Sequence, residues 1–210
     1  IPAYSANIIA ETPDGDPDNV VVIGAHLDSV MAAPGINDNG SGSATILAIA
    51  TELSRLRLSP VNKIRFLWFG GEENGLLGSK YYVSQLGDAR LQLALMLNYD
   101  MLGSPNYMIG VYNGTSRSPT SGSGVIQSVL QSFASAHGIP FVQTPFTGRS
   151  DYGPFLDISV PSGGLFSGAE QPKANGERSL FGGLPGVAYD PCYHQACDTI
   201  DNINWDSITK

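Results

Sequence analysis

The 210-residue sequence is poor in cysteine, histidine and basic residues, and it lacks long apolar runs. Its formal net charge is −8, from 11 basic and 19 acidic residues, without a cluster of Lys or Arg. This argues against nucleic acid or an anionic membrane as a partner and leaves cationic ligands such as metal ions open. No apolar stretch approaches the ~20 residues that a membrane-spanning helix requires, and no signal peptide is evident.

Several signatures of enzymes and nucleotide-binding proteins are also missing. The sequence has no G-x-S-x-G pentapeptide of α/β-type serine hydrolases and no H-E-x-x-H of helix-borne zinc proteases. The glycine-rich segment 35–43 is not followed by the lysine of a phosphate-binding loop, and a dinucleotide-binding G-x-G-x-x-G is absent. Cys192 and Cys197 form a lone C-x4-C pair, which is weak evidence for zinc and favours a disulfide in an oxidising setting.

The length and the 42% content of hydrophobic residues predict one globular domain, able to bury about 70% of its unfolded surface. Runs typical of buried strands alternate with apolar residues at helical spacing. The predicted strands are 19–26, 63–70, 93–100, 107–113, 139–145 and 160–166, with one more near residue 8, and the predicted helices are 41–56, 75–86, 124–138 and one near residue 205. This alternation predicts a single-domain α/β/α sandwich with a mostly parallel, mixed sheet and helices on both faces.

Polar residues follow three of the predicted strands at their carboxyl ends. They are His26 and Asp28 after the first strand, Glu72 and Glu73 after the second, and Asn98 and Asp100 at the end of the third. In open parallel sheets these ends meet at one edge, where sites form. Asp38 precedes a predicted helix that packs on the same sheet. The sequence therefore gathers several carboxylates and one imidazole in one place.

Each of these residues alone has an ordinary structural explanation, such as a helix cap, a turn or a hydrogen bond at a strand end. Together, however, the acids would repel one another unless a cation held them. Histidine and carboxylate ligands without cysteine suit zinc or a similar divalent ion in a catalytic site.

Five segments resemble the secreted two-zinc aminopeptidases of the leucyl-aminopeptidase type, and they occur in the order of that family. The segments are "GAHLDS" (24–29), "GINDNGSG" (35–42), "WFGGEENGLLGSKYY" (68–82), "LNYDMLGSPN" (97–106) and "CYHQACDT" (192–199). The resemblance implies two Zn²⁺ ions, for which other divalent ions are conceivable substitutes. It places His26 and Asp100 on one ion, Glu73 and His194 on the other, and Asp38 between both.

The same resemblance divides the remaining roles. It makes Glu72 the general base that activates a bridging water, Asp28 the carboxylate that holds the His26 ring, and Tyr193 the donor to the oxyanion. We expect the Cys192–Cys197 disulfide to hold Tyr193 in place. Substrate-binding positions of the family correspond to Arg149, Met101, Gly148, Phe166 and Tyr193. The pocket for the first side chain is therefore expected to be apolar, favouring Leu, Phe or Met.

These matches predict a secreted, monomeric metallo-aminopeptidase that removes large apolar N-terminal residues from peptides with a free N-terminus. Residues 1–210 would form its catalytic domain, without the N- and C-terminal flanking helices of other members. Calcium binding stays open, and Asn113-Gly114-Thr115 is a candidate glycosylation site. The sequence also departs from the family at Tyr152, where a histidine is common.

Three alternatives remain. A carboxypeptidase on the same metal frame would need a cationic cluster for the substrate carboxylate, and Arg149 is nearly alone in the later loops. A glutaminyl cyclase would work with one metal ion. A catalytically inactive, metal-bearing binding domain would not need Glu72.

Overall fold

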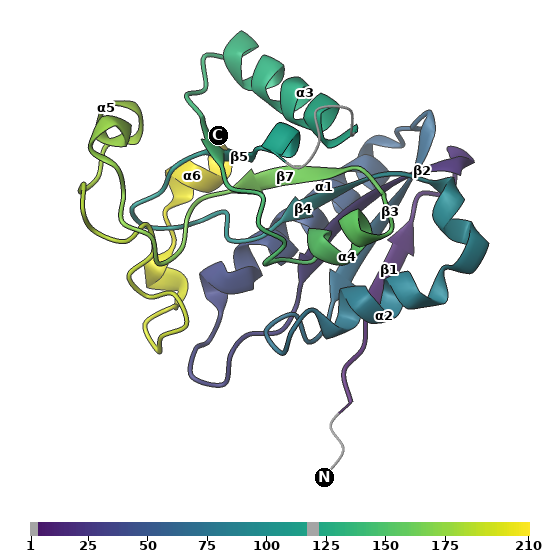
Figure 1. The fold of residues 1–210 in the computed structure, drawn as a ribbon, viewed down its shortest axis with the longest axis horizontal. Coiled ribbons are helices and arrows are strands. Elements are labelled where there is room, and N and C mark those ends of the chain that lie inside the picture. Colours follow the sequence, from purple (N-terminus) through teal and green to yellow (C-terminus); the bar gives the residue numbers. More distant parts are fainter. Residues whose placement is uncertain (1–3, 117–121) are drawn as a thin grey trace.

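The computed structural model describes residues 4–116 and 122–210, and within them a mixed sheet of seven strands forms the centre of the protein (Figure 1). The strands are β1 Ile8–Glu11, β2 Asp16–His26, β3 Asn62–Phe69, β4 Leu93–Tyr99, β5 Gly110–Tyr112, β6 Val142–Thr144 and β7 Ser162–Phe166. Their order in the sheet is β1-β3-β2-β4-β7-β5-β6. β2, β3, β4 and β7 are parallel to one another, whereas β1 is antiparallel to β3 and β5 is antiparallel to β7.

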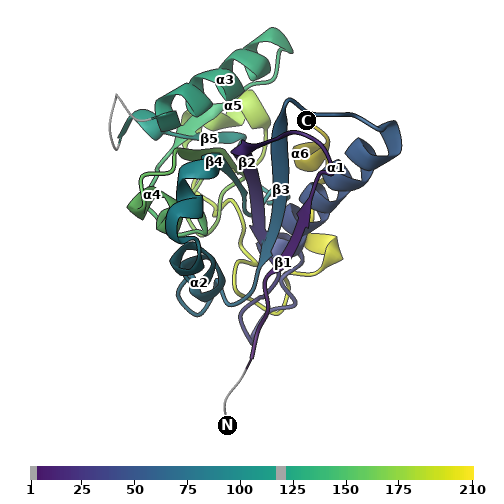
Figure 2. The ribbon, with the colours of Figure 1, turned by 90° about the vertical axis from the view of Figure 1, so that its right-hand side faces the viewer.

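Helices lie on both sides of this sheet (Figure 2). They are α1 Gly42–Leu56, α2 Leu77–Gln85, α3 Gly122–Ala136, α4 Tyr152–Asp157, α5 Arg178–Phe181 and α6 Trp205–Thr209. Short 3-10 turns span Gly87–Gln92, Gly114–Ser116, Asn175–Glu177 and Ile200–Asn202, and an irregular turn, Ile36–Ser41, precedes α1. This arrangement confirms the predicted α/β class with a mixed sheet.

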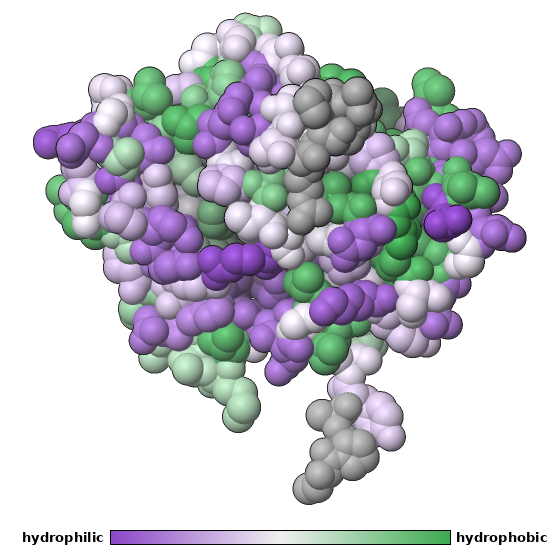
Figure 3. All heavy atoms as spheres, viewed as in Figure 1, coloured by the Kyte–Doolittle hydropathy of each residue, from purple (hydrophilic) through white to green (hydrophobic). Residues whose placement is uncertain are grey.

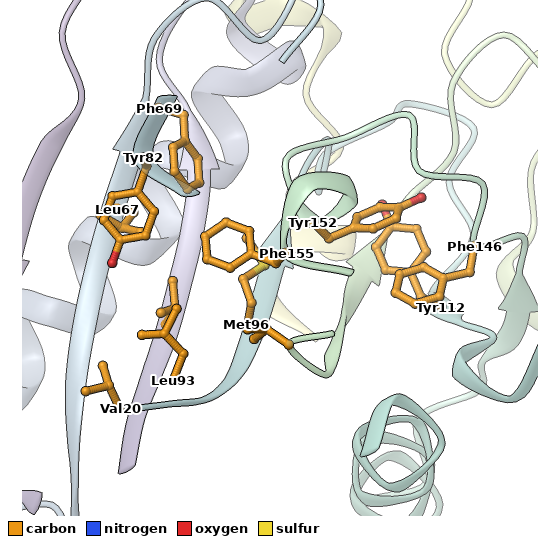
Figure 4. Close-up of a cluster of buried hydrophobic side chains, with 12 residues drawn as sticks. Val20, Leu67, Phe69, Tyr82, Leu93, Met96, Tyr112, Phe146, Tyr152 and Phe155 are labelled. Carbon is orange, nitrogen blue, oxygen red and sulfur yellow. The ribbon is translucent and has the colours of Figure 1, made fainter. Parts of the chain in front are cut away.

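The central strands are buried on both faces where their sequences are continuously apolar, as at residues 20–23 of β2 and 66–69 of β3. On one face, alternate residues of β2 and β3 pack against α2 and α4 (Figure 4). This cluster contains Val20, Val22, Leu67, Phe69, Met96, Tyr82 of α2 and Phe155 of α4. On the other face, Ile23, Phe66 and Trp68 pack against Ile46 of α1. Burial of each large side chain stabilises the fold by roughly 1.5–3 kcal/mol.

The outer elements differ from the sequence-based expectation. β5 and β6 are only three residues long, shorter than the predicted 107–113 and 139–145. The sequence pattern did not predict α4 or α5, because helices of six and four residues are too short to show an apolar period. The antiparallel pairings of β1 and β5 follow from tertiary packing, which local sequence does not encode.

The surface in the view of Figure 3 mixes hydrophilic and hydrophobic residues. Among the described residues, none of the helices has the length and apolar character needed to cross a bilayer. The feature that matters for function is the edge where β2, β3 and β4 end together, at His26, Phe69 and Tyr99. The polar residues singled out by the sequence follow these ends.

Candidate metal centre

One group of potential metal ligands forms where β2 and β4 end. His26 is the last residue of β2, and Asp100 directly follows β4. The Nε2 atom of His26 lies 3.2 Å from Oδ1 of Asp38 and 3.3 Å from Oδ1 of Asp100. These three residues therefore converge as one candidate metal-binding group.

A second group shares Asp38. Nε2 of His194 lies 3.1 Å from Oδ2 of Asp38 and 3.1 Å from Oε2 of Glu73. Asp38, Glu73 and His194 form the second candidate group. Asp38 thus directs one carboxylate oxygen toward each group, which is the arrangement expected of a residue that bridges two ions.

The turn that carries Asp38 sits close to the end of β4. The side chain of Asn39 accepts the N–H groups of Gly42 and Met101, and its amide donates to the carbonyl of Tyr99 at 3.0 Å. Gly42 permits this approach, since a Cβ at that position would collide with the Tyr99 carbonyl oxygen. Gly42 therefore lets the turn that carries Asp38 pack against the end of β4, next to Asp100.

The electrostatics of these groups call for a cation. Burial raises the pKa of Asp38, and burial together with the charge of Asp38 raises the pKa of Glu73 to about 8. Among the described residues, Oε1 of Glu73 and Nε2 of His194 are buried atoms without a hydrogen-bond partner. Buried polar atoms are normally paired, so these two fit a metal ion as their missing partner. The donor set of imidazoles and carboxylates without sulfur fits zinc in a catalytic site.

Glu72 lies beside these groups but belongs to neither. Burial, and then the charge of Asp100, raise the pKa of Glu72 to about 9. The backbone N–H groups of Glu72 and Glu73 donate to the two carboxylate oxygens of Asp28, at 3.0 and 3.2 Å. This anchor fixes the backbone of the pair and leaves the two glutamate side chains in different surroundings.

Asp28 contacts His26 differently from the sequence-based prediction. Nδ1–H of His26 donates a hydrogen bond to the backbone carbonyl of Asp28 at 3.0 Å. The carboxylate of Asp28 is 3.7 Å from Nδ1. The Asp28 carboxylate therefore lies near the imidazole but beyond hydrogen-bonding distance, and it accepts the glutamate N–H groups instead.

Ser150 is a site residue that the sequence reasoning missed. Its Oγ donates to Oδ2 of Asp100 at 2.5 Å and accepts from the amide of Asn98 at 2.8 Å. Burial disfavours ionisation of Asp100, but His26 and Ser150 outweigh this and lower its pKa. Only its place beside Arg149 in the segment 147–155 could have drawn attention to Ser150.

A cavity of about 690 Å³ opens next to the two groups. Met101, Arg149, Phe166 and Tyr193 line it, as the sequence predicted, whereas Gly148 is not among its lining residues. Gly148 instead donates its N–H to the hydroxyl of Tyr152, which does line the cavity. The structure therefore places Tyr152, rather than Gly148, in the cavity wall.

The loop that carries Tyr193 and His194 is closed by a Cys192–Cys197 disulfide, as predicted. The rings of Tyr193 and His194 stack with centroids 3.8 Å apart. Arg149 forms an ion pair with Glu170, with 3.0 Å between Nη1 and Oε1. The cavity is therefore lined by the candidate ligands together with a mixture of apolar and polar side chains.

Comparison with known proteins places this chain in a family. The sequence signature of Peptidase family M28 matches residues 7–210, which include both candidate groups. The chain belongs to Peptidase family M28. This agrees with the resemblance carried by the five sequence segments.

Relatives of this M28 chain support the same placement. Leucine aminopeptidase 2 of Trichophyton rubrum is 48% identical over 207 residues, covering 96% of this chain and 41% of the relative. The structure of a zinc aminopeptidase from Bacillus subtilis matches with a TM-score of 0.76 at 27% identity, covering 97% of this chain and 46% of that one. A glutaminyl cyclase from an Acidobacteriales bacterium matches with a TM-score of 0.71 at 21% identity, covering 96% of this chain and 68% of that one, which shows a shared fold alone. The M28 chain spans less than half the length of the two aminopeptidases.

Proposed function

We propose that residues 1–210 form the catalytic domain of a two-zinc aminopeptidase that hydrolyses the N-terminal residue of peptides. The observation that carries this proposal is the pair of ligand groups that share Asp38. His26 and Asp100 would hold one ion, and Glu73 and His194 the other. When bound, a pair of divalent ions lowers the pKa of a water molecule and polarises the scissile carbonyl.

Glu72 would act as the general base. It lines the same cavity as the metal groups without belonging to either, so its carboxylate would stay free of metal and available to exchange protons. Its carboxylate would take a proton from the attacking water and pass it to the leaving amine. The hydroxyl of Tyr193, which lines the cavity, would donate a hydrogen bond to the developing oxyanion.

The charge distribution favours a substrate with a free N-terminus. The carboxylates around the site would attract an α-ammonium group. Arg149 is the only Lys or Arg among the described residues that line the cavity, and it is already paired with Glu170. A carboxypeptidase would need a free cation there for the substrate carboxylate, so this alternative fits less well.

The cavity wall supports a preference for large apolar first residues. Met101 and Phe166 line it as predicted, and Met108 and Tyr112 add further apolar surface. Leu, Phe and Met side chains would bury apolar area there, with roughly 25 cal/mol gained per Å² removed from water.

A glutaminyl cyclase is the second candidate, because such an enzyme shares the fold. A cyclase that works with one ion would not require two complete ligand groups. The second group, Asp38, Glu73 and His194, therefore favours the aminopeptidase.

The test uses amino-acid p-nitroanilides with matched N-acetylated controls, measured with zinc, after chelation, and after zinc is restored. We expect hydrolysis of leucine p-nitroanilide that is lost with chelator and recovered with zinc, and no hydrolysis of the N-acetylated substrate. Efficient cleavage of N-acetyl-leucine p-nitroanilide, or a preference for Asp or Glu, would contradict the proposal. Cyclisation of an N-terminal glutamine without amide hydrolysis would support the cyclase.

We further infer that the protein works as a monomer outside the cell. The Cys192–Cys197 disulfide supports an oxidising compartment, since thiols stay reduced in the cytosol. Detection of the native protein in the culture medium of its source, together with its mass in solution, tests both points.

A further inference from the structure

Two buried carboxylates outside the metal groups flank the disulfide loop. Asp190 precedes Cys192 and is 1% exposed, and Asp198 follows Cys197 and is 0% exposed. Burying an ionised carboxylate is costly unless hydrogen bonds compensate it. Their bonding partners therefore indicate what these two residues do.

Asp198 binds the backbone of the turn that carries the shared ligand. Its Oδ1 accepts the N–H of Asn37 at 2.8 Å, and its Oδ2 accepts the N–H of Asp38 at 3.1 Å. The two residues of each bond are about 160 positions apart in the sequence. Because both oxygens bind consecutive N–H groups, the peptide plane before Asp38 is held in one orientation.

Asp190 ties the ligand loop to the same turn. Its Oδ1 accepts the N–H of Cys192 at 2.8 Å, and its Oδ2 accepts the side-chain amide of Asn37 at 2.6 Å. The amide of Asn202 donates to both Asp190 and Asp198. The turn with Asp38 and the loop with His194 are therefore joined through one buried network.

We propose that Asp198 is a positioning residue that aims the carboxylate of Asp38 at both ligand groups, and that Asp190 holds the His194 loop in register with it. This rests on the proposed two-metal site. Asp38 must present Oδ1 to His26 and Oδ2 to His194 at the same time. A small rotation of the Asp38 backbone would move its carboxylate out of position for the two ligand groups. Loss of Asp198 should therefore weaken the binding of both ions.

The two aspartates predict different defects. Asp198→Asn removes an acceptor that faces the N–H groups of Asn37 and Asp38, and we expect both zinc ions to bind about 10–100-fold more weakly. Asp190→Asn loosens the loop that carries His194 and should weaken mainly one ion. Asp201→Asn changes an exposed carboxylate in the next turn and should leave zinc binding unchanged.

The measurement is a zinc titration of metal-free protein in competition with a chromophoric chelator, with unfolding of the metal-free variants followed by circular dichroism. A parallel titration with Co²⁺ reports ligand geometry through its visible absorption. A purely structural role would lower the unfolding temperature and leave the cobalt spectrum of the folded protein unchanged. Altered cobalt bands in folded Asp198→Asn are expected instead.

A second variant covers the case in which Asp198→Asn does not fold. Asn202→Ala removes the amide between the two carboxylates without changing either of them, and we expect a smaller loss of zinc affinity. The proposal would be overturned if folded Asp198→Asn kept the zinc affinity and cobalt bands of the wild type. If Asp198→Asn does not fold, the same result for Asn202→Ala would overturn it. Zinc binding that depends on Asp198 in a chain without peptidase activity would refute the proposed function alone.

Discussion

At the scale of single residues, Glu72 and Glu73 are adjacent but differ in what they contact. Glu73 lies 3.1 Å from His194, whereas Glu72 is in neither ligand group. Asp28 holds both backbone N–H groups of the pair, which lies in the turn after β3. One carboxylate is therefore available to a metal ion and its neighbour to a proton.

Substitution by glutamine separates the two roles. Glu73→Gln replaces a charged ligand by a neutral amide and should lower the affinity for one ion. Glu72→Gln should keep two ions and lower kcat by about 10²–10⁴-fold, because only proton transfer is lost. Metal content and steady-state kinetics decide the matter. Loss of metal from Glu72→Gln with retention in Glu73→Gln would reverse the assignment.

Asp151 gives a prediction on stability against pH. It is fully buried, and neither of its carboxylate oxygens has a hydrogen-bond partner among the described residues. Burial raises its pKa to about 7, above the value of about 3.9 in an unfolded chain. The folded state therefore binds this proton more tightly. The stabilisation is complete below about pH 4 and is lost as the pH rises toward 7.

Asp151→Asn should remove this pH dependence. In metal-free protein, the difference in Tm should shift in favour of the variant as the pH rises from about 4 to about 7, and then stay constant. Differential scanning calorimetry of both proteins over this range measures it. Parallel Tm curves for the two proteins would show that Asp151 does not titrate in this way.

The convergence of the candidate ligands was predictable because His26, Glu73 and Asp100 lie at or after strand ends and because all five occur in recognisable segments. Ser150, Asp190 and Asp198 were not, since their partners lie 50 to 161 residues away in the sequence. Asp28 was assigned to the correct partner, His26, but it contacts the ring through its backbone carbonyl rather than through a carboxylate hydrogen bond. Local sequence identifies which groups reach an edge, while tertiary packing decides which of them hydrogen-bond.

At the scale of elements, the site depends on rigid strands and on one irregular loop. β2, β3 and β4 were predictable from their apolar runs, and their parallel order places His26, Glu73 and Asp100 at one edge. The loop of Cys192 and Cys197 has no regular structure to hold His194. Its disulfide and its hydrogen bonds to Asp190 take that role.

Removing this disulfide should affect catalysis more than stability. A bridge between residues five apart closes a short loop, so its effect on the entropy of the unfolded chain is small. The double variant Cys192→Ser/Cys197→Ser should therefore keep most of its unfolding temperature but lose activity and part of its zinc. The double change avoids a single free thiol that could bind zinc. A large fall in Tm with unchanged kcat and zinc content would contradict this expectation.

At the scale of the whole molecule, the alternation of strand and helix patterns in the sequence predicted the α/β class. It did not predict the antiparallel pairing of β1 and β5 or the presence of α4. Those features depend on contacts between distant segments. α4 supplies Phe155 to the core and Tyr152 to the cavity wall, so the substrate pocket includes an element that the sequence pattern did not reveal.

The number of metal ions per chain tests the account most directly. Protein saturated with Zn²⁺ and then freed of excess metal is analysed by atomic emission spectroscopy against a quantitative amino-acid analysis. Because Asp38 offers one oxygen to each of two ligand groups, we expect two zinc ions per chain. A firm value of one zinc ion per chain would contradict the two-metal site and would favour the glutaminyl cyclase function instead.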